Sequence, residues 1–275
     1  MLMQYLLEKV LLRGLEEKIR KAQRVFLFLD YDGTLTSIQN TPDLALLSSS
    51  TRRTLQSLSS LPQMILTVIS GRTLSEIQKL IGLDNVNYVG NHGLEMKVKS
   101  HKYVINQHKK IRKKISLFCQ RIKRKTHWFS GVLVENKGLS ASIHYRLAKE
   151  DCVPELKKIV SATIYPFKRS YELRDGKKVL EIRPKTKRNK GWAVNEIIHR
   201  YNSKRKTYSL YFYLGDDLTD EDAFQLVNSK RGYSIRVDKR KEPSNAHHYL
   251  KGPKEVRLFL GWFKRILTQK ERRKP

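Results

Sequence analysis

Short runs of almost continuous apolar residues alternate along this chain with longer stretches whose apolar residues recur at helical spacing. The strongest runs lie at 24–30, 63–70 and 210–217, and weaker ones lie at 86–90 and 233–237. Such runs are typical of parallel strands that are buried on both faces of a sheet. The helical spacing predicts helices at 2–22, 43–60, 74–82, 187–202, 218–229 and 254–268. Strands that alternate with helices predict a doubly wound, parallel α/β sheet with right-handed crossovers.

The middle of the chain has a different pattern. It contains a basic helical stretch, several apolar segments that resemble antiparallel strands, and a second helical stretch at 153–163. The pair Asp175-Gly176 between two apolar segments indicates a hairpin. We therefore expect an α+β module at 97–184, inserted into a discontinuous α/β domain that consists of 1–96 and 185–275.

Composition excludes several classes of protein. The 275 residues are 39% hydrophobic, which is enough for a sizeable core and argues against intrinsic disorder. Two cysteines, Cys119 and Cys152, cannot form a disulfide framework and favour reduced thiols in a cytosolic protein. The sequence has neither an uncharged apolar run of membrane-spanning length nor a signal-peptide pattern. We therefore expect a cytoplasmic protein with no membrane partner.

The charge is unusual. The chain has 56 Lys and Arg residues against 26 Asp and Glu residues, and 101–125 holds ten basic residues and no acidic one. A basic segment of this kind indicates either a solvated helix face or a module that binds nucleic acid. We favour the solvated face and expect no nucleic-acid partner. A mobility-shift assay at two salt concentrations separates the two interpretations, because phosphate contacts depend steeply on salt.

Polar residues that are able to do chemistry follow the three strongest strands. Ligands of open α/β sheets bind at the carboxyl ends of the strands, so this placement has a physical meaning. The first strand ends in Asp30-Tyr31-Asp32-Gly33-Thr34, where two close carboxylates favour a hard cation as partner. The alternative for this segment is a surface turn, because Asp-Gly is a common turn pair.

The other two strand ends leave a structural alternative open as well. Ser70-Gly71-Arg72 suits a phosphate oxygen, or else a plain helix N-cap beside a turn glycine. Five of the seven residues 216–222 are acidic. A helix N-terminus explains Asp220 and its acidic successors, but it explains Asp216 and Asp217 less well, which favours a metal site. Lys190, between Asn189 and Gly191, is a further candidate for this site, and the alternative for it is an ordinary solvated lysine.

The ordered set DYDGTL, SGR, NKG and GDDLTDED resembles the haloacid-dehalogenase-like (HAD) phosphohydrolase superfamily. That resemblance implies a Rossmann-like α/β core with helices on both faces, and the insert resembles the C2-type α/β cap of the sugar-phosphatase branch. Further motifs narrow it: GNHGLE, VENKGLS, HYR and LEIRP, together with GDDLTDEDAF, are similar to the trehalose-6-phosphate phosphatase family. The similarity runs from about residue 24 to residue 260.

The resemblance implies roles for particular residues. Asp30 would be the nucleophile and Asp32 the general acid and base. Mg²⁺ would be bound by the Asp30 side chain, the Asp32 backbone carbonyl and Asp216, with Asp217 and Asp220 acting through water or by positioning. The substrate-binding residues of the core would be Thr34, Ser70, Gly71, Arg72 and Lys190.

The resemblance also implies a reaction and a substrate. The reaction would be hydrolysis of trehalose 6-phosphate through an aspartyl-phosphate, within trehalose biosynthesis and functionally paired with a trehalose-6-phosphate synthase. Glu135, Lys137 and Glu181 in the insert would contact the sugar. For Glu135 and Lys137 the alternative is an exposed pair on one face of a strand. A phosphatase for sucrose phosphate or mannosylglycerate phosphate remains a second possibility, which substrate profiling would separate.

Overall fold

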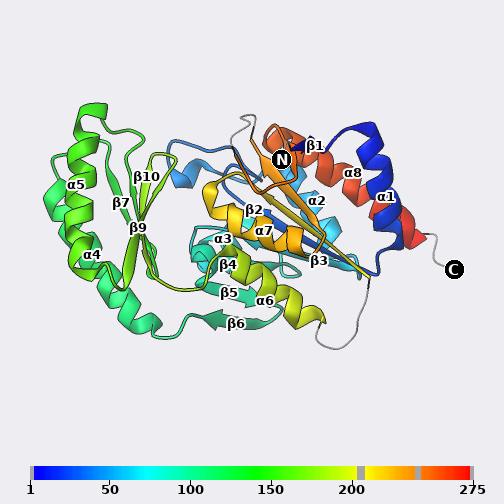
Figure 1. The fold of residues 1–275 in the computed structure, drawn as a ribbon, viewed down its shortest axis with the longest axis horizontal. Helices are drawn as coiled ribbons and strands as arrows, with labels where there is room; N and C mark the ends of the chain where they lie inside the picture. The colour runs from blue at the N-terminus through cyan, green and yellow to red at the C-terminus, as the bar shows by residue number, and fades with distance from the viewer. Residues whose placement is uncertain (1–2, 203–207, 239–242, 273–275) are drawn as a thin grey trace. The chain divides into compact units, whose positions relative to one another are not determined.

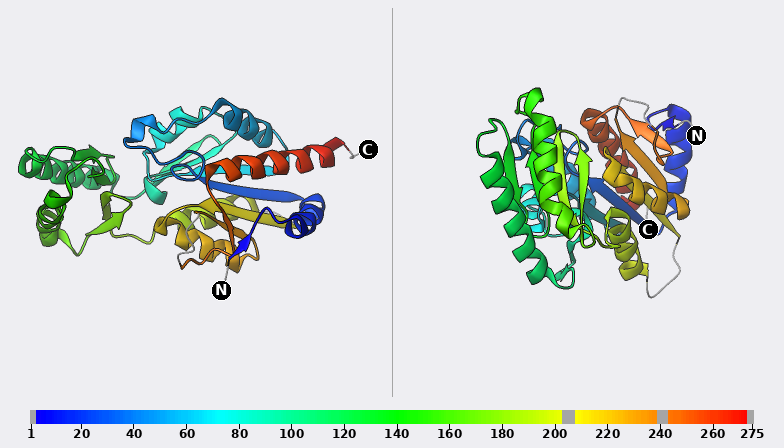
Figure 2. Two further views of the ribbon diagram at one scale, coloured as in Figure 1. Left: turned by 90° about the horizontal axis from the view of Figure 1, so that it is seen from above. Right: turned by 60° about the vertical axis from the view of Figure 1, so that its left-hand side comes forward.

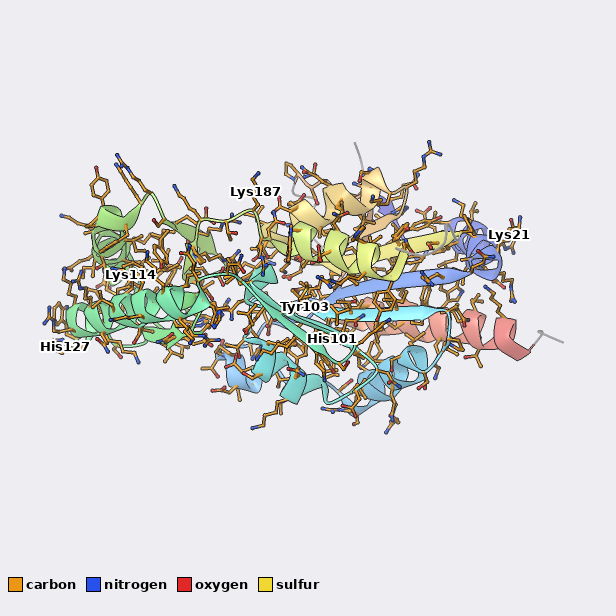
Figure 3. All side chains as sticks on the ribbon, turned by 90° about the horizontal axis from the view of Figure 1, so that it is seen from below. Lys21, His101, Tyr103, Lys114, His127 and Lys187 are labelled. Carbon is orange, nitrogen blue, oxygen red and sulfur yellow. The ribbon has the colours of Figure 1, made fainter. Side chains whose placement is uncertain are left out.

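The computed structural model describes residues 3–202, 208–238 and 243–272, and the chain divides into two compact units. The core unit consists of Met1–Tyr103 and Arg188–Pro275, and the inserted unit of Val104–Lys187. Figure 3 labels Tyr103 and Lys187, which lie beside the two crossings between the units. The expected borders were 97 and 184. The later first crossing follows from two strands, β5 (Glu95–Val98) and β6 (His101–Val104), which continue the sheet of the core unit.

The core unit is built on one sheet, which has nine strands within the described residues (Figure 1). Its order is β1-β13-β12-β11-β2-β3-β4-β5-β6. The seven strands from β1 to β4 in this order pair in parallel, and β5 is antiparallel to β4. Besides β5 and β6, the strands are β1 (Gln4–Tyr5), β2 (Arg24–Asp30), β3 (Met64–Ile69), β4 (Asn87–Gly90), β11 (Ser209–Gly215), β12 (Tyr233–Val237) and β13 (His248–Leu250).

Helices cover both faces of this sheet, because each helix buries an apolar stripe against it. One face carries α1 (Lys9–Lys21), α2 (Ser49–Ser59), α3 (Leu74–Ile81) and α8 (Pro253–Arg272). The other face carries α6 (Lys190–Asn202) and α7 (Glu221–Ser229). Figure 2 shows α6 and α7 across the sheet from α2 and α3. The predicted α/β class, with a largely parallel sheet and helices on both faces, is confirmed.

Several predicted helices begin later than the apolar spacing indicated. The helix expected from residue 43 starts at Ser49, because the hydroxyl of Ser48 accepts a hydrogen bond from the Thr51 N–H at 3.2 Å and caps it. The helix expected from residue 2 starts at Lys9. The residues before it form β1, which pairs in parallel with β13. Neither β1 nor β13 was predicted, because two or three residues carry too little pattern.

The inserted unit packs two helices against one face of an antiparallel sheet, whose strand order is β7-β8-β10-β9. The predicted hairpin is confirmed, but its turn lies at residues 177–178. Asp175 and Gly176 instead pair with Leu180 and Val179 inside the ladder. The elements are α4 (His108–Thr126), α5 (Val153–Ile164), β7 (Leu133–Asn136), β8 (Ala141–His144), β9 (Tyr171–Gly176) and β10 (Val179–Pro184).

Within the described ranges, the structure contains no helix with the length and apolar character needed to cross a membrane.

Candidate active site in the core unit

Carboxylates from two adjacent strand ends meet at the carboxyl edge of the core sheet. Asp30 is the last residue of β2, and Asp216 and Asp220 follow β11, its neighbour in the sheet. Each of the three offers one carboxylate oxygen within 4.8 Å of the others, and all three side chains are buried. Carboxylate oxygens are the ligands that hard divalent cations prefer, so this donor set fits a divalent metal.

The loop after β2 requires a glycine to form this cluster. Gly33 has φ of +83°, a conformation that L side chains rarely adopt. A Cβ at Gly33 would lie 2.2 Å from Oδ2 of Asp216, so no larger residue leaves room for that carboxylate. The turn is closed by the Gly33 N–H, which donates to the carbonyl of Thr36 at 2.8 Å. The sequence Asp-Gly-Thr therefore forms the turn that brings Asp30 next to Asp216.

Lys190 supplies a positive charge to the cluster. It is the first residue of α6 and is 2% exposed, so the alternative of a solvated lysine is wrong. Its ammonium group donates to Asp30 Oδ1 at 2.7 Å and to Asp220 Oδ1 at 2.6 Å. Together these three carboxylates and one ammonium carry surplus negative charge, which a divalent cation would offset.

Asp220 organises its neighbours through four hydrogen bonds. Its Oδ1 accepts from Lys190 and, at 2.6 Å, from the hydroxyl of Tyr213. Its Oδ2 accepts from the backbone N–H groups of Asp216 and Asp217 at 3.1 and 3.0 Å. Both oxygens of Asp220 are thus engaged within the protein, which fits a positioning role better than direct metal binding.

Burial shifts the ionisation of this cluster. Desolvation raises the pKa of Asp30 well above its ordinary value, and the ammonium of Lys190 opposes that shift. Burial lowers the pKa of Lys190, but the attraction of Asp220 and Asp30 outweighs it, so Lys190 stays protonated. Burial and the nearby Asp220 raise the pKa of Tyr213, which keeps its hydroxyl a hydrogen-bond donor. Sequence reasoning missed Tyr213. Its only signal was that a tyrosine in a buried strand needs a polar partner.

The sequence-predicted phosphate-binding residues lie near the same strand ends. Thr34 is fully buried, and within the described residues its Oγ1 has no hydrogen-bond partner. A buried hydroxyl without a partner costs free energy of folding, and such a group fits a site that binds a polar ligand. The hydroxyl of Ser70, next after β3, accepts from the N–H of Arg72 at 3.1 Å. Gly71 lies against His92, where a Cβ would be 2.3 Å from the ring nitrogen Nε2.

Asp32 and Arg72 form a two-pronged ion pair that sequence reasoning did not foresee. Nε and Nη2 of Arg72 donate to the two carboxylate oxygens of Asp32 at 2.8 and 2.7 Å. The Asp32 side chain remains 41% exposed, whereas that of Arg72 is 10% exposed. Asp32 therefore lies outside the carboxylate cluster of Asp30, Asp216 and Asp220, although its backbone follows Asp30 closely.

The polar face of the inserted unit carries the residues assigned to the sugar. Glu135 of β7, Ser142 of β8 and Glu181 of β10 are in register across three strands and so share one face. The residues next to them along these strands, such as Ile143 and Leu180, point to the other face and pack against α4 and α5. The apolar face thus builds the core of this unit and leaves the carboxylates on the opposite side of the sheet.

A hydrogen bond and two ion pairs organise that polar face. The Glu135 carboxylate is 2.8 Å from Nε2 of His144 and 3.7 Å from the ammonium of Lys137. Glu181 pairs with Arg183 on the same strand. Lys137 is 9% exposed and the Glu135 side chain is 24% exposed, so the alternative of an exposed Glu135–Lys137 pair is wrong for both residues.

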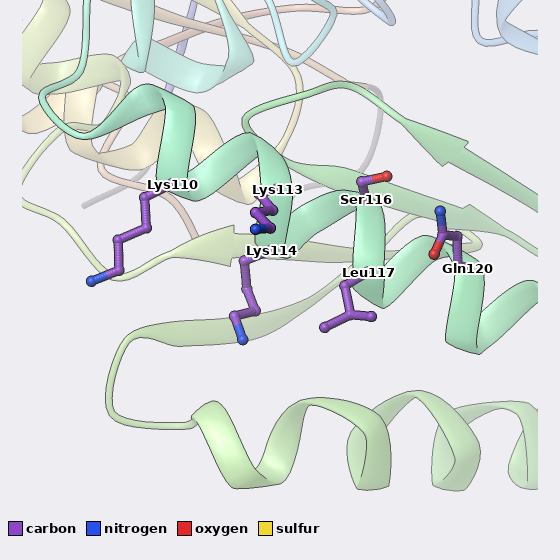
Figure 4. Close-up of a pocket in the computed structure, with 6 residues that line it drawn as sticks. All are labelled: Lys110, Lys113, Lys114, Ser116, Leu117 and Gln120. Atoms are coloured by element: carbon purple, nitrogen blue, oxygen red, sulfur yellow. The ribbon is translucent and has the colours of Figure 1, made fainter.

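The basic segment forms the solvent side of α4. Nine of its ten lysines and arginines lie on α4, and none of these nine makes an ion pair with another described residue. Figure 3 labels Lys114 on this helix. A pocket of about 420 Å³ lies along the helix, and Figure 4 draws the residues that line it. The pocket is lined by Lys110, Lys113, Lys114, Ser116, Leu117 and Gln120.

Comparison with known proteins decides the family. The model of the trehalose-phosphatase family matches residues 28–254, which include the carboxylate cluster, Lys190, and the polar face of the inserted unit. The chain belongs to the trehalose-phosphatase family. This confirms the predicted family and its class of enzyme, the phosphatases.

Individual relatives agree with that assignment. Trehalose-phosphate phosphatase B of Arabidopsis thaliana is 28% identical over 250 residues, which are 87% of this chain and 66% of that protein. The probable trehalose-phosphate phosphatase E of the same plant is 32% identical over 262 residues, 89% of this chain and 72% of that protein. The chain thus spans about two thirds of the length of these relatives. The C-terminal domain of C. albicans trehalose-6-phosphate phosphatase superposes with a TM-score of 0.79 at 27% identity, covering 92% of this chain and 97% of that one.

Proposed function

We propose that this protein hydrolyses trehalose 6-phosphate to trehalose and inorganic phosphate. The observation that carries the proposal is the buried cluster of Asp30, Asp216, Asp220 and Lys190 within a chain of the trehalose-phosphatase family. Phosphate monoesters hydrolyse extremely slowly in water, and enzymes accelerate such reactions by up to roughly 10²¹-fold. Charged groups that are preorganised in a site from which water is excluded supply this kind of acceleration.

In the first step, a carboxylate oxygen of Asp30 attacks phosphorus and the bond between phosphorus and the sugar oxygen breaks. Asp32 donates a proton to that leaving oxygen. In the second step, water attacks the aspartyl-phosphate and gives its proton to Asp32, and the bond to Asp30 breaks to release phosphate. A covalent intermediate divides one difficult displacement into two easier ones. The ammonium of Lys190, the hydroxyls of Thr34 and Ser70, and the Gly71 N–H would hold the phosphoryl oxygens.

We propose Mg²⁺ as the metal, held by the Asp30 carboxylate, the Asp32 backbone carbonyl and Asp216. Bound there, it would neutralise phosphate charge and orient the ester. Asp220 and Asp217 would position these ligands. The hydrogen bonds of Asp220 to the backbones of Asp216 and Asp217 support that division of labour.

We propose that the inserted unit is a cap that selects the sugar through Glu135, Lys137 and Glu181. A disaccharide presents hydroxyl groups, which buried charged groups bind well. Such a site also discriminates strongly against an analogue that lacks one of these hydroxyl groups. The row of carboxylates across β7 and β10 supports this assignment. The substrate must be made by an enzyme that joins a sugar to a sugar phosphate, so we propose functional pairing with a trehalose-6-phosphate synthase. Two free cysteines support a cytoplasmic location.

We propose no nucleic-acid role for 101–125. The apolar stripe of α4 is buried in the inserted unit, so its basic stripe is the side that an amphipathic helix turns to solvent. A mobility-shift assay near physiological salt is expected to give no complex. A complex whose affinity falls steeply with salt would contradict this.

The function is tested by phosphate release from a panel of sugar phosphates, each with Mg²⁺ and with EDTA. The panel contains trehalose 6-phosphate, sucrose 6-phosphate, mannosylglycerate phosphate and glucose 6-phosphate. We expect the highest kcat/KM for trehalose 6-phosphate, no activity in EDTA, and recovery on adding Mg²⁺. A preference for another member of the panel would overturn the substrate, and full activity in EDTA would overturn the metal.

A further inference from the structure

The Arg72 guanidinium is held on three sides by the core unit. Nε and Nη2 donate to the two oxygens of Asp32, and Nη2 also donates to the carbonyl of Pro42 at 2.8 Å. The ring of Tyr31 lies 5.3 Å from its central carbon, and the Tyr31 hydroxyl donates to the carbonyl of Ala45 at 2.8 Å. Arg72 is thus fixed by contacts from the loop after β2 and from the segment before α2.

This geometry leaves Arg72 poorly placed to bind phosphate. Guanidinium groups recognise phosphates and carboxylates by presenting two parallel N–H donors. In Arg72 the fork formed by Nε and Nη2 is already occupied by Asp32, and Nη2 also donates to the carbonyl of Pro42. A phosphate would have to compete with a carboxylate that lies two residues from the nucleophile. The family resemblance had implied that Arg72 is one of the substrate-binding residues.

We infer that Arg72 is a positioning residue that orients the carboxylate of Asp32 for proton transfer at the leaving oxygen, and that it does not bind the phosphate. The inference rests on the proposed function, in which Asp32 is the acid and base. Proton transfer requires the donor within hydrogen-bond reach of the reacting oxygen, and it contributes about 10²–10⁴-fold to rate. A carboxylate that is 41% exposed and has no clamp would sample many orientations.

Two substrates separate this role from phosphate binding. The leaving oxygen of trehalose 6-phosphate is a basic alkoxide that needs a proton, whereas p-nitrophenyl phosphate releases a stable phenolate that does not. The kcat/KM of the aryl ester reports only steps up to release of nitrophenolate, so it is insensitive to acid catalysis. Its kcat also includes hydrolysis of the aspartyl-phosphate, in which Asp32 acts as the base.

The test uses Arg72→Met, which keeps the side-chain stem over Tyr31 but removes the fork. We expect kcat/KM for trehalose 6-phosphate to fall by about ten- to a hundredfold, a part of the full contribution of proton transfer. We expect kcat/KM for p-nitrophenyl phosphate to stay within about threefold of wild type, since no proton is needed there. The kcat for this ester should fall, with a burst of nitrophenolate close to one equivalent per protein.

Asp32→Asn should give the same pattern, and the double variant Arg72→Met/Asp32→Asn should lose little more than Asp32→Asn alone, because the two residues act as one unit. Arg72→Lys, which keeps the charge without the fork, gives a second readout if Arg72→Met fails to fold. It should show a weaker form of the same split.

Equal losses of kcat/KM on both esters would overturn the inference, because they would mean that Arg72 binds the shared phosphate. Unchanged kinetics on both esters would overturn it too. Wild-type protein that hydrolyses neither ester would instead refute the proposed function, so the two failures are distinguishable.

Discussion

Replacing Lys190 by Met tests the charge balance of the cluster. The substitution keeps the length and apolar stem of a buried side chain but removes an ammonium that lies 2.7 Å from Asp30 and 2.6 Å from Asp220. Asp220 keeps the Tyr213 hydroxyl and two backbone N–H donors. Most of the loss therefore falls on Asp30, whose buried carboxylate loses a charged partner.

The expected size follows from the burial of the pair. Removing one partner of a buried ion pair costs about 3–5 kcal/mol, because the remaining charge is left without compensation. At about 2–4 °C per kcal/mol for a domain of this size, the melting temperature should fall by roughly 6–20 °C. The double variant Asp30→Asn/Lys190→Met removes both charges and should recover most of this loss.

The pH dependence has a definite sign. Burial raises the pKa of Asp30, and the loss of Lys190 removes the attraction that opposes this shift. A carboxyl whose pKa is higher in the folded state binds its proton more tightly there, so its contribution favours folding at low pH and is lost as pH rises. The deficit of Lys190→Met should therefore be larger at about pH 8 than at about pH 5.

Calorimetry in EDTA at both pH values measures these effects, with exposed Lys187→Met as the matched control. The control should melt within about 0.5 kcal/mol of wild type. The reasoning is refuted if Lys190→Met lies within about 1 kcal/mol of wild type. It is equally refuted if the double variant is no more stable than the single one.

Three further predictions concern other residues. Asp30→Asn should keep the fold by circular dichroism but retain less than about a hundredth of wild-type phosphate release, and higher activity would contradict a covalent mechanism. Glu135→Ala or Glu181→Ala should lower kcat/KM for trehalose 6-phosphate at least about tenfold, which corresponds to about 1.4 kcal/mol. Both kcat and kcat/KM for p-nitrophenyl phosphate should stay nearly unchanged. Equal losses on both esters would mean a structural role. Burial lowers the pKa of His248 from 6.5 to about 4, so the folded state should lose stability as pH falls through that range. Urea unfolding of His248→Gln should show a smaller loss than wild type over the same interval, and an identical pH dependence would count against this.

Local patterns predicted the parts of the fold that have strong periodicity. The strands at β2, β3 and β11 were found because almost every residue is apolar, as burial on both faces demands. The hairpin β5–β6 was missed because its second strand, His101–Val104, begins with two exposed polar residues and has no apolar run. The first crossing between the units therefore lies several residues later than expected.

The site was predictable where residues directly follow buried strands, and unpredictable where side chains from separate loops pair with one another. The strand-end rule brings Asp30 and Asp216 to one edge, and the structure has them there. The bond between Asp32 and Arg72 joins residues 40 apart, and that between Lys190 and Asp30 joins residues 160 apart. No local pattern specifies such partners, because they depend on how loops from separate strands fold over the sheet edge.

The most direct test of the account is capture of the phosphoryl group on Asp30. Asp32→Asn protein is mixed with radiolabelled p-nitrophenyl phosphate and Mg²⁺, and the reaction is quenched with acid during the first turnover. Because this ester needs no acid to leave and the variant lacks the base for the second step, the aspartyl-phosphate should accumulate. The account predicts a burst of nitrophenolate matched by protein-bound label, released by hydroxylamine and mapped to the peptide that contains Asp30. Steady release of nitrophenolate with no label on the protein, or label on another residue, would contradict it.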